Sequence, residues 1–154
     1  MVNAIGETTA QAPDIAPKGL GGWMILPVIG TCLAPWLPLW QVIQSISLVS
    51  SPNLAADLRN FILVEVIGYV LISLIWLVAI VLLFTKKRSY PRVFIAGQTA
   101  SLVLIASDLL VAHFGFDLAP DPSDIKSLAR AVIGSAIWIP YMLVSKRVAN
   151  TFVN

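Results

Sequence analysis

The sequence has very little of what metal-binding and nucleic-acid-binding proteins use. Charged residues make up 12% of its 154 residues, against a usual share of roughly 25%. A single cysteine, Cys32, excludes a disulfide within the chain, and with the single His113 it leaves no closed set of four zinc ligands. The basic residues form no stripe of the kind that binds nucleic acid. We therefore expect no metal, no cofactor and no nucleic-acid partner.

Catalytic signatures are also missing. Gly19, Gly21 and Gly22 precede an apolar run, and no G-K-[ST] completes a phosphate-binding loop. The H-E-x-x-H pattern of zinc proteases and the G-x-S-x-G pattern of serine hydrolases do not occur. We therefore expect that the protein is not an enzyme.

Long apolar runs, in contrast, are abundant. Hydrophobic residues reach 58% of the chain, above the roughly 45–50% of globular domains. Each run is close to the ~20 residues that a helix needs to cross a hydrocarbon core of ~30 Å. The sequence therefore predicts an all-α membrane protein, with four transmembrane helices in an up-down antiparallel bundle. Their expected ranges are 20–43, 58–84, 93–114 and 124–144.

The chain divides into a short leader and one membrane domain. Residues 1–18 carry Glu7 and Asp14 with one basic residue, unlike the positive start of a signal peptide, and the apolar run that follows is longer than a signal peptide uses. We expect residues 1–18 to be a disordered cytoplasmic leader and residues 19–154 to be the four-helix domain.

The distribution of Lys and Arg predicts the orientation. Four spans put both termini on one side, which also receives the connection between the second and third helices. Seven basic residues fall on that side and three on the other, so the positive-inside rule places both termini in the cytoplasm. The inner set is Lys18, Lys86, Lys87, Arg88, Arg92, Lys146 and Arg147, and the outer set is Arg59, Lys126 and Arg130.

The basic connection between the second and third helices, residues 85–92 (TKKRSYPR), is short enough to make those helices an antiparallel hairpin. Its charges either set the topology or bind anionic lipid head groups, and we favour topology. On the outer side, Pro122 followed by Ser123 and Asp124 predicts a turn and an N-cap for the last helix.

Three ionisable residues are expected inside the membrane. Glu65, Asp108 and Arg130 lie about 12, 13 and 9 Å deep, counted from the nearest outer aspartate at 1.5 Å per residue. A charge left in hydrocarbon costs at least ~2.5–3.5 kcal/mol, so such groups usually face inward and find partners. We expect Arg130 to bridge to Asp108, Glu65 or both. The trio is either a structural ion-pair network, which we favour, or a proton or ion relay.

Prolines and small residues indicate how the helices bend and pack. Pro35 and Pro38 should bend or break the first helix in its outer half, or shape a pore there. Small residues four apart predict close approach of the third and fourth helices, and two glycines near the charged residues should leave room for them. These residues are Gly97 with Ser101, Ala131 with Ser135, and Gly68 and Gly134.

Two end motifs resemble a known family. Residues 19–27 (GLGGWMILP) enter the first helix, and residues 137–141 (IWIPY) lead into 145–148 (SKRV) and 151–153 (TFV). These motifs are similar to those of the bacterial inner-membrane family called domain of unknown function 2569. The resemblance covers the chain from Gly19 onward. It implies four spanning helices in the bacterial inner membrane, and it brings no known activity, cofactor or site.

The motif residues also have a direct physical reading. Glycines allow close backbone approach, aromatic rings anchor at head-group level, a proline near a helix end kinks it, and basic residues fix the exit from the membrane. These features build either ordinary anchoring, which we favour, or a docking surface for another membrane protein. The residues are Gly22, Trp23, Pro27, Trp138, Pro140, Tyr141, Lys146 and Arg147.

Two functions from different classes remain after this reading. The first is an accessory, scaffold or assembly factor, whose partners are membrane lipids and either a larger membrane complex or a second copy of the chain. The second is a small transport or proton-coupling module that uses Glu65, Asp108 and Arg130. An enzyme comes third.

Overall fold

A computed structural model describes residues 19–153, and within that range it contains helices and no strands. The expected leader, residues 1–18, lies outside the described residues. The all-α fold is therefore confirmed. The elements in chain order are the 3-10 turn η1 (Gly22–Met24) and the helices α1 (Ile25–Leu33), α2 (Trp36–Val49), α3 (Ala56–Phe84), α4 (Tyr90–Phe116), α5 (Pro122–Val144) and α6 (Lys146–Thr151).

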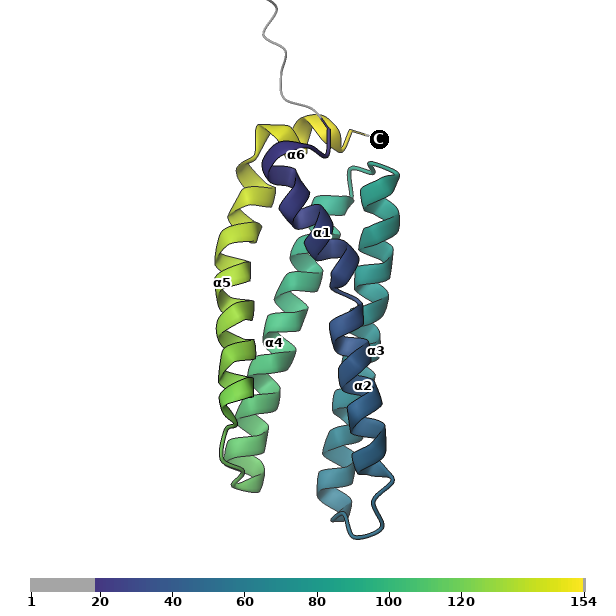
Figure 1. Cartoon of the computed structure of the whole chain (residues 1–154), viewed down its shortest axis with the longest axis vertical. Helices are drawn as coiled ribbons and strands as arrows, with labels where there is room; N and C mark the ends of the chain where they lie inside the picture. The colour runs from purple at the N-terminus through teal and green to yellow at the C-terminus, as the bar shows by residue number, and fades with distance from the viewer. Residues whose placement is uncertain (1–18, 154) are drawn as a thin grey trace, which may run out of the picture.

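Four of these helical segments are long and apolar enough to span a membrane, as expected. They run alternately up and down (Figure 1). We call the end that holds Gly19, Val153 and the 85–89 connection the termini end, and the other the distal end. The spans are Gly22–Val49, Ala56–Phe84, Tyr90–Phe116 and Pro122–Val144.

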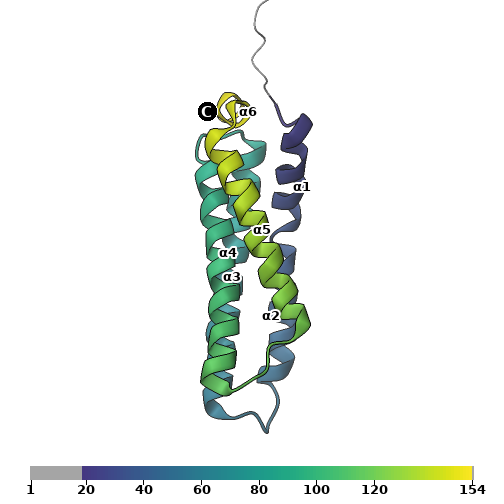
Figure 2. The ribbon, with the colours of Figure 1, turned by 90° about the vertical axis from the view of Figure 1, so that its left-hand side faces the viewer.

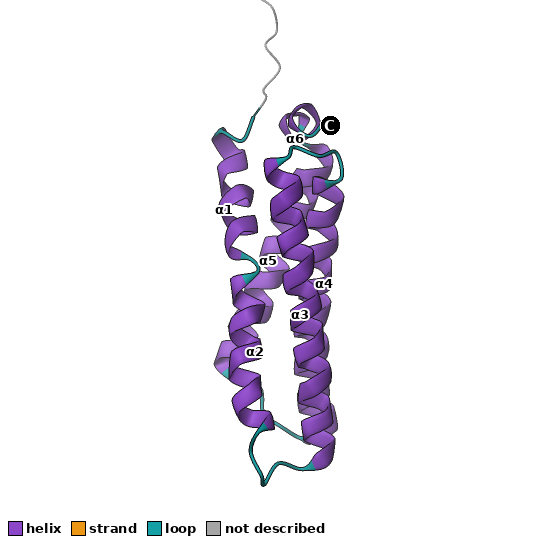
Figure 3. Cartoon of the chain, turned by 90° about the vertical axis from the view of Figure 1, so that its right-hand side faces the viewer, coloured by secondary structure: helices purple, strands orange, loops and turns teal. Residues whose placement is uncertain are grey.

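The first span is broken in its middle, as its prolines predict. α1 ends at Leu33 and α2 begins at Trp36, and the short loop between them is visible in Figure 3. Pro35 has no backbone N–H to continue the helical ladder. The carbonyl oxygen of Pro35 accepts a hydrogen bond of 3.4 Å from the Ser73 hydroxyl of α3. Pro38 lies in the first turn of α2, where a missing N–H costs nothing.

The start of α5 differs by two residues from the prediction. The N-cap is Asp121, which accepts a bond from the Ser123 amide at 2.8 Å, while Asp124 accepts one from the Asp121 amide at 3.2 Å. Pro122 is the first helical residue, where its fixed φ suits a helix start. The predicted cap at residues 123–124 was therefore wrong, because the proline begins the helix and does not precede the cap.

The buried side chains gather toward the termini end. Ten of them form one cluster, and they come from the halves of α3, α4 and α5 nearest that end together with η1 and the C-terminal segment. Within the spans, such side chains stabilise the fold by van der Waals packing against one another, because lipid is as apolar as they are. The termini end is thus the tightly packed part of the molecule. The cluster is Met24, Ile72, Trp76, Ala79, Leu83, Tyr90, Phe94, Met142, Val148 and Phe152.

The four spans pack as an open row. α3 packs along both α2 and α4, and α4 packs along α5, whereas α5 makes few contacts with α1 or α2. Figure 1 shows the α2–α3 pair and the α4–α5 pair diverging toward the distal end, and Figure 2 shows α5 inclined across α4. One long side of α5 therefore has no helix neighbour among the residues that the structure describes.

Small residues allow close approach between α4 and α5, as expected. A Cβ on Gly134 of α5 would lie 3.1 Å from the Gln98 side chain of α4, and the neighbouring Ser135 is buried.

Small residues also bring α3 and α4 together, which was not expected. A Cβ on Gly97 would lie 3.2 Å from Ile75 and 3.3 Å from Trp76, and Ser101 accepts a bond from the Trp76 indole at 3.4 Å. This face of α4 therefore packs on α3 and not on α5. A Cβ on Gly68 would lie 2.8 Å from Leu104, so this glycine makes room for a leucine and not for a charged side chain.

Candidate functional site

Two acidic side chains from neighbouring helices come together in the distal half. Glu65 of α3 and Asp108 of α4 are both half-buried, and their carboxyl groups are near enough to repel each other when both are ionised. Glu65 lies nine residues from the start of α3 and Asp108 eight residues from the end of α4, so both are about 12–14 Å from the distal ends of their helices. The sequence prediction that these acids share a level is consistent with this placement.

Uncharged polar side chains accompany the pair. Tyr69, one turn from Glu65 on α3, is only 6% exposed, and its hydroxyl lies close to the Glu65 carboxyl and to the Gln41 amide of α2. Three helices thus contribute to one polar cluster inside the spans. We call Gln41, Glu65, Tyr69 and Asp108 the acidic cluster.

Arg130 is not part of this cluster. Its side chain is exposed, and its Nε donates to the Lys126 carbonyl at 3.3 Å. The charged group of α5 that acts on Glu65 and Asp108 is Asp124. Six residues correspond to about 240° around a helix, so a face that presents Asp124 turns Arg130 away. The predicted bridge from Arg130 to Asp108 or Glu65 was therefore wrong.

The acidic cluster can bind a proton or donate and accept hydrogen bonds, which is the chemistry of paired carboxyl groups beside a hydroxyl. Within residues 19–153, no group of three or more His, Cys, Asp or Glu side chains could hold a metal ion. The chemistry that the acidic cluster itself can supply is therefore proton binding and hydrogen bonding.

A second group of candidate residues lies at the termini end, where the two end motifs touch. Arg147 Nη1 donates to the Gly21 carbonyl at 2.8 Å, and the Gly19 amide donates to the Thr151 hydroxyl at 2.9 Å. Gly22 has φ +61°, and a Cβ there would lie 3.4 Å from the Arg147 guanidinium. The predicted close approach at Gly22 is thus to a side chain that joins the first and last segments.

Hydrogen bonds and stacked rings continue this junction inward. Thr31 Oγ1 donates to the Pro27 carbonyl at 2.7 Å and lies 2.9 Å from the Tyr90 hydroxyl. Because the Thr31 proton is used on Pro27, Tyr90 is the donor to Thr31. The Tyr90 ring then stacks at 4.5 Å on Phe152. The contact between Thr31 and Tyr90 was not predicted, because each residue appears in the sequence only as a polar group inside or beside an apolar run.

The remaining motif residues are placed as follows. Trp138 packs edge-to-face on Tyr141 with ring centroids 5.8 Å apart, and Trp23 is 76% exposed. Pro140 lies inside α5, which continues to Val144. Lys146 begins α6, a helix that the sequence did not predict, and the side chain of Ser145 caps it by accepting from the Val148 amide at 3.4 Å.

Comparison with known proteins agrees with this architecture. The family model described as Protein of unknown function (DUF2569) matches residues 17–153. The chain is also similar to Inner membrane protein YdgK of Escherichia coli (strain K12), with 24% identity over 145 residues that cover 90% of this chain and 96% of the relative. No solved structure matches the chain. With its four apolar spans and a match over almost its whole length, the chain belongs to the DUF2569 family and is a multi-pass protein of the bacterial inner membrane.

Proposed function

We propose that the protein is an accessory or assembly factor for a membrane complex and has no chemistry of its own. The observation that carries this proposal is the long side of α5 that no helix within residues 19–153 covers. Ile133 and Ile137 are 59% and 54% exposed. Small membrane proteins that serve a complex need such a free helical face, because helices in lipid associate by packing.

Arg130 supports the same proposal. It lies eight residues inside α5, about 12 Å from the start of the helix. The hydrogen bond from Arg130 Nε to the Lys126 carbonyl turns the side chain toward the distal end. Within residues 19–153, the guanidinium makes no other hydrogen bond. A guanidinium at this depth in lipid costs at least ~2.5 kcal/mol. An acceptor on a partner helix would remove that cost.

Photo-crosslinking in native membranes tests the proposal. A photoreactive amino acid at Ile133 or Ile137 should give a discrete heavier product that contains a second protein. The matched control is Val78 on α3, which is 51% exposed and should give lipid adducts alone. Arg130→Gln should reduce the product from Ile133, whereas Lys126→Gln, which removes the same charge nearer the helix start, should not. Lipid adducts alone from both α5 positions would contradict the proposal.

A second candidate function has its own supporting observation. Glu65 of α3 and Asp108 of α4 are half-buried acids at a similar level of two helices that pack together. Intramembrane acids so placed are typical of proton relays. In this alternative the protein is a small proton-coupling module, and the acidic cluster carries the proton.

Reconstitution separates the two candidates. If the alternative holds, proteoliposomes with a trapped pH dye should acidify under an imposed gradient, and Glu65→Gln or Asp108→Asn should abolish the signal. Asp57→Asn is the control, because Asp57 is exposed in the first turn of α3. If the accessory proposal holds, no variant changes the dye signal and Glu65→Gln leaves the Ile133 crosslink unchanged.

A further inference from the structure

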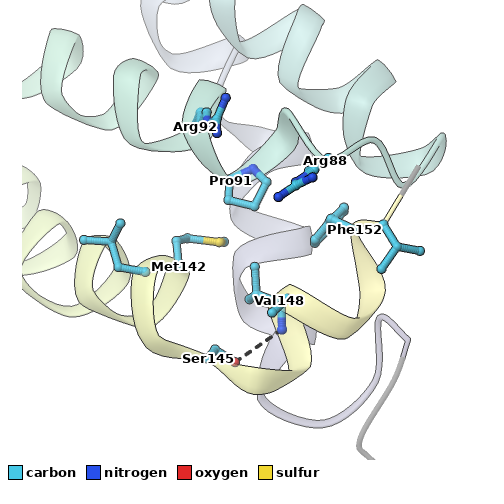
Figure 4. A pocket seen from close by; sticks show the side chains of 10 residues that line it. Arg88, Pro91, Arg92, Met142, Ser145, Val148 and Phe152 are labelled. Carbon is cyan, nitrogen blue, oxygen red and sulfur yellow. Dashed lines mark hydrogen bonds between the residues drawn. The ribbon is translucent and has the colours of Figure 1, made fainter.

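A cavity of about 460 Å³ opens at the termini end, between the start of α4 and the C-terminal segment. Figure 4 shows Arg88, Pro91 and Arg92 along one side and Met142, Val148 and Phe152 along the other. It lies where α3 has ended, α4 begins and α5 ends, so its level is that of the lipid head groups.

The cavity is basic at its rim and apolar at its base. Arg88 and Arg92 are exposed, whereas Met142, Val148 and Phe152 are 4%, 2% and 3% exposed. Leu143 and Val153 also line it and are 69% and 66% exposed. An apolar surface therefore continues from the cavity onto the outside of α5 at Leu143 and onto the C-terminal segment at Val153.

The two arginines are available to a ligand. Within residues 19–153, the arginine hydrogen bonds are those of Arg59, Arg130 and Arg147, so the guanidinium groups of Arg88 and Arg92 have no such partner there. Among the described residues, no Asp or Glu lines the cavity. The positive end of the dipole of α4, a helix of 27 residues, adds to the same field.

We propose that this cavity binds one anionic phospholipid, with its phosphate between Arg88 and Arg92 and its acyl chains along Leu143 and Val153. The guanidinium group of an arginine donates two parallel hydrogen bonds to two oxygens of one phosphate. A head group with an added ammonium would meet only positive charge, since the cavity has no carboxylate. A free phosphate would use the arginines but would leave the apolar base and its outward continuation unfilled.

This site differs from general attraction between basic residues and the membrane. Lys86 and Lys87 belong to the same connection and carry the same charge, but they do not line the cavity. A pair of variants with equal charge loss therefore separates binding in the cavity from the topological role of these residues.

Native mass spectrometry of the whole chain in a non-ionic detergent tests the proposal. Short-chain phosphatidylglycerol is titrated against phosphatidylcholine with the same acyl chains. We expect one phosphatidylglycerol per chain, bound at least about tenfold more tightly than phosphatidylcholine. Arg88→Gln with Arg92→Gln should lose at least about tenfold in affinity, and Lys86→Gln with Lys87→Gln should stay within about twofold of the unmodified chain. The Arg88→Lys, Arg92→Lys pair keeps the charge without the fork and should fall between them.

Three results would overturn the proposal. If the Lys86→Gln, Lys87→Gln pair loses as much affinity for phosphatidylglycerol as the Arg88→Gln, Arg92→Gln pair, the lipid is attracted to the basic loop as a whole and is not bound in the cavity. Equal binding of the two lipids would mean that the arginines do not select the head group. Displacement of the lipid by inorganic phosphate at the same concentration would mean a soluble-anion site without a role for the acyl chains. Circular dichroism of each variant checks that the helices are intact.

Discussion

The guanidinium of Arg147 lies against the backbone of Gly22, with Nη1, Cζ and Nη2 at 3.4, 3.5 and 3.6 Å from the place where a Cβ would stand. The same side chain donates to the Gly21 carbonyl at 2.8 Å across a separation of 126 residues. The Arg147 side chain, together with the bond from the Gly19 amide to the Thr151 hydroxyl, therefore holds the segment that enters the first span to the segment that leaves the last one.

Gly22→Ala tests this contact. The left-handed φ of +61° costs an alanine about 1–2 kcal/mol. The new methyl would only reach van der Waals contact with the Arg147 guanidinium, so the backbone conformation decides the sign of the effect. We expect a lower melting temperature in detergent, measured by circular dichroism.

Gly30→Ala is the matched control within the same span. No atom lies within 4 Å of a Cβ placed on Gly30, and alanine in a helix interior gains roughly 0.5–1 kcal/mol over glycine. The two substitutions should therefore shift the melting temperature in opposite directions. Equal shifts would mean that Gly22 has no special conformation in the folded protein.

A second prediction concerns the Thr31 and Tyr90 hydroxyls, which lie 2.9 Å apart. Thr31→Val and Tyr90→Phe should each cost about 1 kcal/mol of unfolding free energy, the usual net value of a buried hydrogen bond. The double variant should cost less than the sum, because the shared bond can be lost only once. Strict additivity in the cycle would show that α1 and α4 are not joined there.

A third prediction compares two glycines of the α3–α4 interface. A Cβ on Gly97 would meet Ile75 and the Trp76 ring, whose indole N–H is hydrogen-bonded to Ser101 at 3.4 Å. Gly97→Ala should therefore cost about 1–3 kcal/mol, as overpacking does. Gly68→Ala should cost less despite its 2.8 Å approach, because that contact is the end of the flexible Leu104 side chain. Thermal unfolding of both variants gives the order, and a reversed order would refute this packing.

A fourth prediction concerns pH at the distal end. Bonds from the Ser123 amide and hydroxyl lower the pKa of the Asp121 carboxyl below its ordinary value. Its stabilisation of the first turn of α5 is therefore complete above the ordinary pKa of aspartate, and it is lost as the pH falls through the lowered one. Amide exchange near residue 124 should speed up in that acidic range in the unmodified chain. Asp121→Asn, which keeps an acceptor but does not titrate, should show no such step.

The sequence predicted the spans and the break at Pro35 because both depend on quantities that a sequence states directly. The length of an apolar run gives the span, and a missing N–H gives the break. The motif ends were also predicted to lie on one side. Their direct contact through Arg147 was not, because a side-chain bond across 126 residues leaves no trace in local pattern.

Rotation of the helices about their axes could not be predicted. Apolar residues surround α3 and α4 almost evenly, because lipid and protein interior are both apolar, so no amphipathic face shows which side meets a neighbour. The depth of Arg130 was therefore predictable while its direction was not. The same reason explains why Gly97 faces α3. The helix α6 was missed because its six residues are too few for a periodic signal.

The uneven core has a mechanical consequence. Because the buried cluster lies at the termini end, that end is the stiff part of the molecule. At the distal end, α3 and α4 stay in contact through the Phe61 and Phe116 rings, whose centroids are 5.3 Å apart, whereas α2 and α5 each pack mainly along one helix. Bending under load should therefore be concentrated in the distal halves of α2 and α5, while the junction at the termini end keeps its shape.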